Sequence, residues 1–478
     1  MLNLIKNEYS KLFHKKSTYF FLAAIVLFII GISVFTKFSC DNNDDIYYSS
    51  IDQELQYATT ETDEYRDDAY IEELKLAKSL DYTMHDIYDN SRWESNALSD
   101  YYSYLSSINS FDKDGSSDLV NSNEDREHYQ KLCDTIVSSL KDNDWKSYIQ
   151  LTADSINNDG HTKDGAKLLK DTYENYLKND IDPDSNTQKY SLISNFSQYD
   201  ISYSDLLSTK ESGASYDETE FNTTESNYLI AKYQLENNTD SVIYKNPDSQ
   251  MSSYEPYIYT GNAFLSLKRC INATIIIALI LIILAGTTVS SEFSNGTIKF
   301  LLITPVKRYK IFWSKFITFL TYGFVLTLLS YVLSVLLTII LFGTGELSTP
   351  LLIVKNGSII ASSGLLHILS NFFMTFGAIM ITAIIAFMLS ALFRNSAIAI
   401  AIPIMIYLGS DMAVSIAQML SLDFVRYTIF ANMSFSNIVE NSFTFFGMTP
   451  IFSVSVIAIH IFLFLFIAHD AFTRRNVN

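Results

Sequence analysis

Six stretches of the chain are apolar over enough residues to cross a membrane. A helix rises about 1.5 Å per residue, so roughly 20 apolar residues span about 30 Å of hydrocarbon. The pattern therefore predicts an α-helical integral membrane protein with six transmembrane helices. The candidate spans are Thr18–Thr36, Cys270–Val289, Phe316–Phe342, Ile368–Leu392, Ala397–Ala417 and Ile451–Ala468.

A long polar stretch separates the first span from the second. Residues 38–265 are rich in Asp, Glu, Asn, Ser and Tyr, a composition that can also be typical of disorder. Apolar residues nevertheless recur at three- and four-residue spacing in 65–80, 125–140, 142–156, 166–177 and 227–236. We therefore expect a large, mainly helical domain here, and no strong strand alternation is seen.

Charge predicts the orientation. Residues 41–262 hold 45 acidic and 17 basic side chains, whereas the rest of the chain holds 7 acidic and 17 basic ones, within a total net charge of −18. Outside the insert, the basic residues gather near Lys6–Lys16, Lys307–Lys315 and Arg474. If the chain crosses the membrane six times, these three groups lie on the same side of it. Because cytoplasmic loops carry an excess of Lys and Arg, both termini are expected in the cytoplasm and the acidic domain outside.

The first 16 residues have the pattern of an interfacial helix. Apolar residues such as Leu2, Ile5 and Leu12 lie at helical spacing among four lysines, so residues 1–16 should lie on the cytoplasmic membrane surface and 17–37 should form the first span. A secretory signal peptide is the alternative. The apolar run is long for that role and no small-residue cleavage site follows it, which favours an uncleaved span.

The membrane part, residues 266–478, contains a cytoplasmic elbow at 291–314. Gly296 permits a tight turn, Thr297 can cap a short helix with Leu301 on its apolar face, and Pro305 ends that helix. Arg308 belongs to the basic cluster that follows. An ordinary basic loop that only orients the protein is the simpler alternative.

The pattern of the elbow resembles a known family. Together with Lys315, the residues that carry the resemblance are Glu292, Gly296, Thr297, Leu301, Pro305 and Arg308. They resemble the loop between the second and third membrane helices of ABC-2 type permeases, the membrane subunits of one class of ATP-binding cassette (ABC) exporter.

This resemblance implies a role and partners. In that family the loop is a coupling helix that docks on a separate ATPase, which holds ATP and Mg²⁺, and two membrane subunits work together. It implies an ABC ATPase, a second permease (a homodimer or a sister subunit) and membrane lipids as partners, with no nucleic acid, in a bacterial cytoplasmic membrane. The substrate class left open is a peptide, an antimicrobial or a lipid-like compound.

The sequence shows no pattern typical of a nucleotide-binding or catalytic site. It contains no Gly-Lys dipeptide and hence no phosphate-binding loop, so we expect no cofactor in this chain and no enzyme activity. Asp411 and His460 are ionisable residues within spans and are candidates for a substrate path, although hydrogen bonding between helices is the plainer role. Glu292, beside the basic cluster, can hold the angle of the elbow.

Three further features stay open at this stage. A disulfide between Cys40 and Cys133 is sterically allowed, and no zinc pattern is present. Aromatic residues in 418–449 suit the outer membrane interface. Because the insert makes up nearly half of the chain, a signalling or mechanotransmission protein that acts through the extracellular domain is the alternative function.

Overall fold

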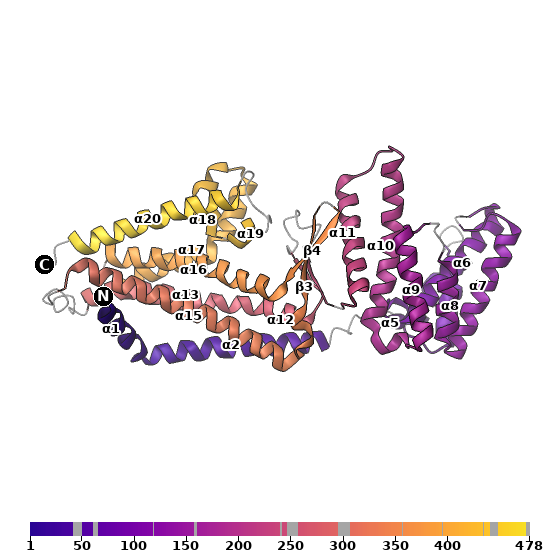
Figure 1. Ribbon diagram of the computed structural model, residues 1–478, viewed down its shortest axis with the longest axis horizontal. Coiled ribbons are helices and arrows are strands. Elements are labelled where there is room, and N and C mark those ends of the chain that lie inside the picture. The colour runs from indigo at the N-terminus through magenta and orange to yellow at the C-terminus, as the bar shows by residue number, and fades with distance from the viewer. Residues whose placement is uncertain are drawn as a thin grey trace. The chain divides into compact units, whose positions relative to one another are not determined.

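The structure is a computed structural model with two compact units (Figure 1). It describes residues 1–41, 50–60, 66–117, 119–156, 160–239, 241–245, 257–294, 306–355, 357–393, 395–433, 435–439 and 448–474. The membrane unit comprises Met1–Asp41, Ser241–Leu351 and Ala361–Asn478. The insert unit comprises Asn42–Asp240 and the hairpin tip Leu352–Ile360.

The membrane unit contains six helical stretches that are long and apolar enough to cross a membrane, as the sequence predicted. Its helices are α1 (Leu2–Phe13), α2 (Lys16–Asp41), α12 (Asn262–Cys270), α13 (Thr274–Ser294), α15 (Arg308–Phe342), α16 (Gly364–Phe393), α17 (Ser396–Met419), α18 (Ile429–Met433), α19 (Phe435–Val439) and α20 (Pro450–Arg474). Short 3₁₀ turns are η2 (Ile271–Ala273), η3 (Gly345–Ser348) and η4 (Asp423–Tyr427).

The second span begins earlier than the apolar run suggested. The helical stretch starts at Asn262, before the predicted start at Cys270, and two cations in this added part have partners. The Lys268 ammonium lies 5.2 Å from the centroid of the Tyr259 ring, and Arg269 Nη1 donates to Thr36 Oγ1 at 3.3 Å.

Helices α13 and α16 form the interior of the membrane unit. In the most apolar windows of these two spans 56% and 67% of the residues are buried, against 22% in α2 and 17% in both α17 and α20. Gly286 lets α13 approach α17 closely, since a Cβ there would lie 2.9 Å from Ile400 Cγ1 and 3.0 Å from the Ala399 carbonyl oxygen. Such close approach of backbones is how helices associate in lipid, where little hydrophobic drive is available.

A small sheet was not expected from the sequence. Its strands are β1 (Ile243–Lys245), β2 (Tyr257–Tyr259), β3 (Pro350–Lys355) and β4 (Ser358–Ser363), in the order β2-β1-β3-β4. Strands β1 and β2 are antiparallel, with Tyr244 opposite Ile258. Strands β1 and β2, with three residues each, are too short to display alternation, and the six residues of β3 include an apolar run rather than an alternating pattern.

The insert unit is helical, as predicted. It contains α3 (Ile51–Thr60), α4 (Asp68–Ser79), α5 (Met84–Tyr88), α6 (Trp93–Asp114), α7 (Asn123–Asp142), α8 (Trp145–Ser155), α9 (Lys163–Asn179), η1 (Pro183–Asn186), α10 (Thr187–Glu211) and α11 (Glu218–Asn237). Its core combines aliphatic and aromatic side chains, and the Trp93 and Tyr148 rings lie 5.8 Å apart within it.

The polar composition of the insert supplies its helix caps. Ser122, Asp144 and Thr162 accept hydrogen bonds from backbone N–H groups at the starts of α7, α8 and α9. Asn143 and Asn238 adopt left-handed conformations at the ends of α7 and α11. Each such cap satisfies backbone groups that a helix end leaves unpaired, so the Asp, Asn, Ser and Thr content is used to define helices.

A buried carboxyl group makes the stability of the insert depend on pH. Glu73 is 6% exposed, and burial, together with the charge of Asp67, raises its pKa to about 7. Because the folded state binds this proton more tightly than the unfolded state, the contribution of Glu73 to stability is greatest below pH 4.5 and is lost as pH rises through 7. The difference between the folded and unfolded pKa of Glu73 corresponds to a loss of about 3 kcal/mol in the free energy of unfolding.

We therefore expect Glu73→Gln to stabilise the insert at pH 7.5 and to weaken its pH dependence. The measurement is thermal unfolding of the full chain, followed by the fluorescence of Trp93 and Trp145. Glu72→Gln, at an exposed neighbour that pairs with Lys75, is the control. A Glu73 variant with the same pH profile as the parent would contradict the assignment.

Candidate functional site

Helix α1 presents charged and apolar side chains to the membrane helices. Its sequence places Glu8 and Lys11 one turn apart, with Tyr9 and Leu12 beside them. Leu12 is buried and Tyr9 packs on the membrane core. The helix therefore packs on α15 through a face that carries one carboxylate and one ammonium group.

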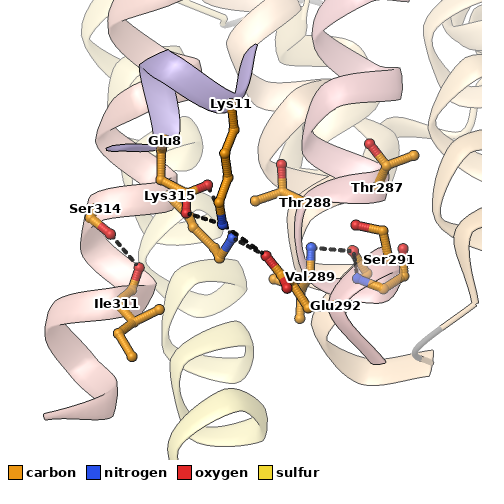
Figure 2. A network of polar contacts seen from close by, with 12 residues as sticks. Glu8, Lys11, Thr287, Thr288, Val289, Ser291, Glu292, Ile311, Ser314 and Lys315 are labelled. Atoms are coloured by element: carbon orange, nitrogen blue, oxygen red, sulfur yellow. Dashed lines mark hydrogen bonds and ion pairs between the residues drawn. The ribbon is translucent and has the colours of Figure 1, made fainter. Parts of the chain in front are cut away.

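A cluster of four charged side chains joins α1, α13 and α15 (Figure 2). We call Glu8, Lys11, Glu292 and Lys315 the four-charge cluster. Lys315 Nζ donates to Glu8 Oε2 at 3.1 Å and to Glu292 Oε1 at 3.2 Å. Lys11 Nζ lies 3.3 Å from Glu8 Oε1 and 3.4 Å from Glu292 Oε1. Each carboxylate thus contacts both lysines.

The four side chains of the cluster differ in their exposure to solvent. The side chain of Lys315 is 2% exposed, those of Glu8 and Glu292 are 15% and 13%, and that of Lys11 is 45%. Burial lowers the pKa of Lys11, but the charges of Glu8 and Glu292 outweigh this and raise it overall. Two cations and two anions leave the cluster neutral, which is the condition under which a buried ammonium group is tolerated.

Neighbouring contacts fix α1 along α15. The Tyr9 hydroxyl lies 2.5 Å from Thr321 Oγ1, and the Phe13 and Tyr322 rings meet edge to face at 6.2 Å. At the turn into α2, Thr18 Oγ1 donates to the Leu12 carbonyl oxygen at 2.6 Å. The four-charge cluster is therefore part of a longer seam between α1 and α15.

The end of α13 is also held from the side of α16 and α17. The backbone N–H groups of Val289 and Ser290 donate to Ser390 Oγ at 3.3 and 2.9 Å. The hydroxyl groups of Ser290 and Ser396 lie 2.8 Å apart. These bonds tie the last turns of α13 to the end of α16 and the start of α17.

The start of α15 is held by the end of α20. Arg308 Nη1 donates to the Thr473 carbonyl oxygen at 3.3 Å. One turn further, Phe312 is fully buried and its ring lies 5.4 Å from His469 and 5.9 Å from Phe472. The end of α13 and the start of α15, which flank residues 295–305, are thus each held by contacts with other helices.

The sequence-predicted elbow residues divide into two groups. Glu292 makes the ion pairs that its position beside basic residues suggested, and Arg308 contacts α20. Gly296, Thr297, Leu301 and Pro305 lie outside the described residues, so the short helix predicted there stays a prediction.

Asp411 and His460 are not joined by any contact among the described residues. Asp411 is exposed on α17. His460 Nδ1 lies 2.8 Å from the Val456 carbonyl oxygen of its own helix, and its ring packs edge to face on Phe464. A substrate path through both residues gains no support from this arrangement.

Two further expectations concern cysteine and metal. Cys133 is a free thiol buried with Ile108 and Val120, so the disulfide with Cys40 gains no support from the structure. Within the described ranges, no group of three or more His, Cys, Asp or Glu side chains is arranged to hold a metal ion.

Sequence reasoning missed the role of Glu8 and the burial of Lys315. Glu8 is the single acidic residue among the first 16, and Lys315 lies at the edge of an apolar span. A lone acidic residue near the start of the chain and a lysine at the edge of a span were the features that could have indicated an ion pair. Lys315 was interpreted as an interfacial cation because its partner Glu8 is 307 residues away in the chain.

We expect Lys315→Met to destabilise the membrane unit by about 3 to 5 kcal/mol, because it leaves two partly buried carboxylates with only Lys11. Combining it with Glu292→Gln should cost less than the sum of the single changes, since one unpaired charge is removed. Thermal unfolding in detergent measures both effects. Lys6→Met, on the exposed face of α1, is the matched control. Additive costs, or a Lys315 variant as stable as the control, would rule out the coupling.

Comparison with known proteins places the chain in a family. Residues 232–478 match the family described as "Protein of unknown function (DUF2705)". Two proteins of Bacillus subtilis (strain 168) are similar to this chain. The "Uncharacterized protein YhcI" is 36% identical over 208 residues, which are 43% of this chain and just under two thirds (66%) of YhcI. The "Uncharacterized membrane protein YdbK" is 33% identical over 205 residues, 42% of this chain and 78% of YdbK.

No solved structure shows a significant similarity to this chain. The family match covers the membrane helices from α12 to α20, and thus both helices that flank the elbow. The chain therefore belongs to the family described as "Protein of unknown function (DUF2705)".

Proposed function

We propose that this protein is the membrane permease subunit of an ABC exporter, which moves a substrate across a bacterial cytoplasmic membrane with a separate ATPase. The observation that carries the proposal is the four-charge cluster, which joins α1 to both helices that flank residues 295–305. A loop held in this way can transmit a push to several membrane helices at once.

The mechanism follows from that connection. A partner that binds ATP and Mg²⁺ contacts residues 295–305 and changes shape on nucleotide binding and hydrolysis. Because α1, α13 and α15 are joined by charge pairs, the displaced loop carries them together. Binding energy in the ATPase thereby shifts the membrane helices between two populations, which open to opposite sides.

The charge distribution supports the orientation. The Lys- and Arg-rich ends of α1, α15 and α20 belong on the cytoplasmic side under the positive-inside bias, together with both termini. In this arrangement the acidic insert, with its helical core, is extracellular. The substrate class remains a peptide, an antimicrobial or a lipid-like compound.

A second permease subunit is supported by the surface of α17. Met405, Met412 and Met419 recur at seven-residue intervals and are 73%, 70% and 88% exposed. Methionine side chains adapt well to a partner surface, so we assign α17 to the contact with a second copy.

A second candidate function is signalling or mechanotransmission through the insert. The observation that favours it is the separate hydrophobic core of the insert unit. Loss of ATP-dependent export of a compound on deletion of the gene would favour the permease. Unchanged export with a lost response to an external stimulus would favour signalling.

The first test of the permease is retention of an ATPase. We expect the full chain, purified in mild detergent from its native membrane, to retain an ABC ATPase detectable by mass spectrometry. Leu301→Asp should abolish this retention because it places a charge on the expected apolar face of the elbow. Ser358→Asp, in the exposed β4 strand, is the control and should retain the ATPase. Equal retention by both variants, or none by the parent, would refute the coupling role.

The second test concerns the α17 contact. In a variant whose three native cysteines are replaced by alanine, Met412→Cys should form a disulfide-linked dimer in native membranes on mild oxidation. Phe462→Cys, which is 69% exposed on α20, should remain monomeric. Gel electrophoresis without reducing agent reports the result. Equal cross-linking at both positions would mean random collision.

A further inference from the structure

A long apolar slot runs along α16 in the membrane unit. The cavity has a volume of about 770 Å³ and is lined by α16, α19 and α20. Its lining includes Leu366, Phe373, Gly377, Ile381, Phe435 and Val454. All of these residues belong to the membrane unit, away from the four-charge cluster on α1, α13 and α15.

The chemistry of the slot excludes a polar ligand. Its lining contains no charged side chain and one hydroxyl group, that of Ser370. Ser370 Oγ already donates to the His367 carbonyl oxygen at 2.7 Å. A polar group placed in the slot would lose its hydrogen bonds to water without replacement, which costs several kcal/mol (about 2–7 on common scales).

The slot is open towards the side and closed at its floor. Leu366 and Val454, at its rim, are 65% and 53% exposed, whereas Met380 and Ile381 are 6% and 3% exposed. These rim residues lie on helices that are long and apolar enough to cross a membrane. In a bilayer, the open side therefore faces lipid.

The length of the slot suits an extended apolar chain. Leu366 and Ile381 are 15 residues apart on one helix, so the lining extends over about 22 Å. An extended hydrocarbon chain matches this length and the apolar lining, and the open side gives it entry from the bilayer.

We propose that this slot is a binding site for one acyl chain of a membrane phospholipid. The chain lies along α16 with its methylene groups against Phe373, Gly377 and Ile381. The head group stays outside the slot, because the lining offers it no partner. This site does not depend on the permease function or on an ATPase partner.

Gly377 provides a probe of the slot. A Cβ at this position would meet no atom within 4 Å, so a large side chain can enter the empty space without displacing the backbone. Gly409 on α17 also has open space at its Cβ position and lies outside the slot lining. Gly377→Trp and Gly409→Trp are thus a matched pair, and Gly377→Leu is a smaller version of the first.

The test is photolabelling of the full chain in nanodiscs with phosphatidylglycerol that carries a diazirine on one acyl chain, followed by mass spectrometry of peptides. We expect label to concentrate on the slot residues of α16 and α20, relative to the exposed residues of α17. Gly377→Trp should lose this label, Gly377→Leu should reduce it, and Gly409→Trp should leave it unchanged. Gel filtration confirms that each variant is folded.

Three results would overturn the proposal. One is equal labelling of the slot and the exposed face of α17, which would mean ordinary lipid contact. Another is labelling of the slot that persists in both Gly377 variants. The third is a disulfide-linked dimer formed by Phe373→Cys in the variant without native cysteines, together with an absence of lipid label, which would make the slot part of a subunit interface.

Discussion

The charge of Lys315 is the constraint on which the arrangement of the membrane unit depends. An ammonium group that is 2% exposed must be matched by anions nearby, because burying an unpaired charge costs far more than a fold can spare. The chain supplies those anions from two other helices, through Glu8 and Glu292. The positions of α1 and of the end of α13 are therefore set by one side chain of α15.

Polar contacts matter more here than they would in a soluble protein. Lipid is as apolar as the helices, so apolar surface alone does not choose one packing arrangement over another. The hydrogen bonds from the α13 backbone to Ser390, and from Arg308 to the Thr473 carbonyl, restrict the register of α13 and α15. Close approach at Gly286 restricts their neighbours sterically.

Much of the architecture could be predicted from local sequence. The six spans follow from apolar runs, and α7 from the apolar spacing in residues 125–140. Helix α10 was harder to recognise, because tyrosine and serine occur all along it and its buried residues include Asp200. The apolar pattern within α10 is weak, and its packing against α11 determines which of its faces is buried.

The site was only half predictable. Glu292 could be found because basic residues follow it in sequence, but the Glu8–Lys315 pair joins positions 307 residues apart. The slot could not be found at all, since it arises from the sizes of side chains on three helices that meet only in the fold. Sequence patterns report local faces of a helix, and both features depend on which faces meet.

The four-charge cluster also limits where the membrane unit can bend. Under the proposed function, separating α1 from α15 during transport would take Glu8 away from Lys315 and leave the buried ammonium group with Glu292 alone, which is costly for a buried charge. Motion at lower cost must keep these helices together and bend elsewhere. The 3₁₀ segment η2 interrupts the second span between α12 and α13, and Pro403 removes a backbone donor within α17. A push on the α13–α15 end would therefore move a joined block of α1, α13 and α15 against α12 and the outer half of α17.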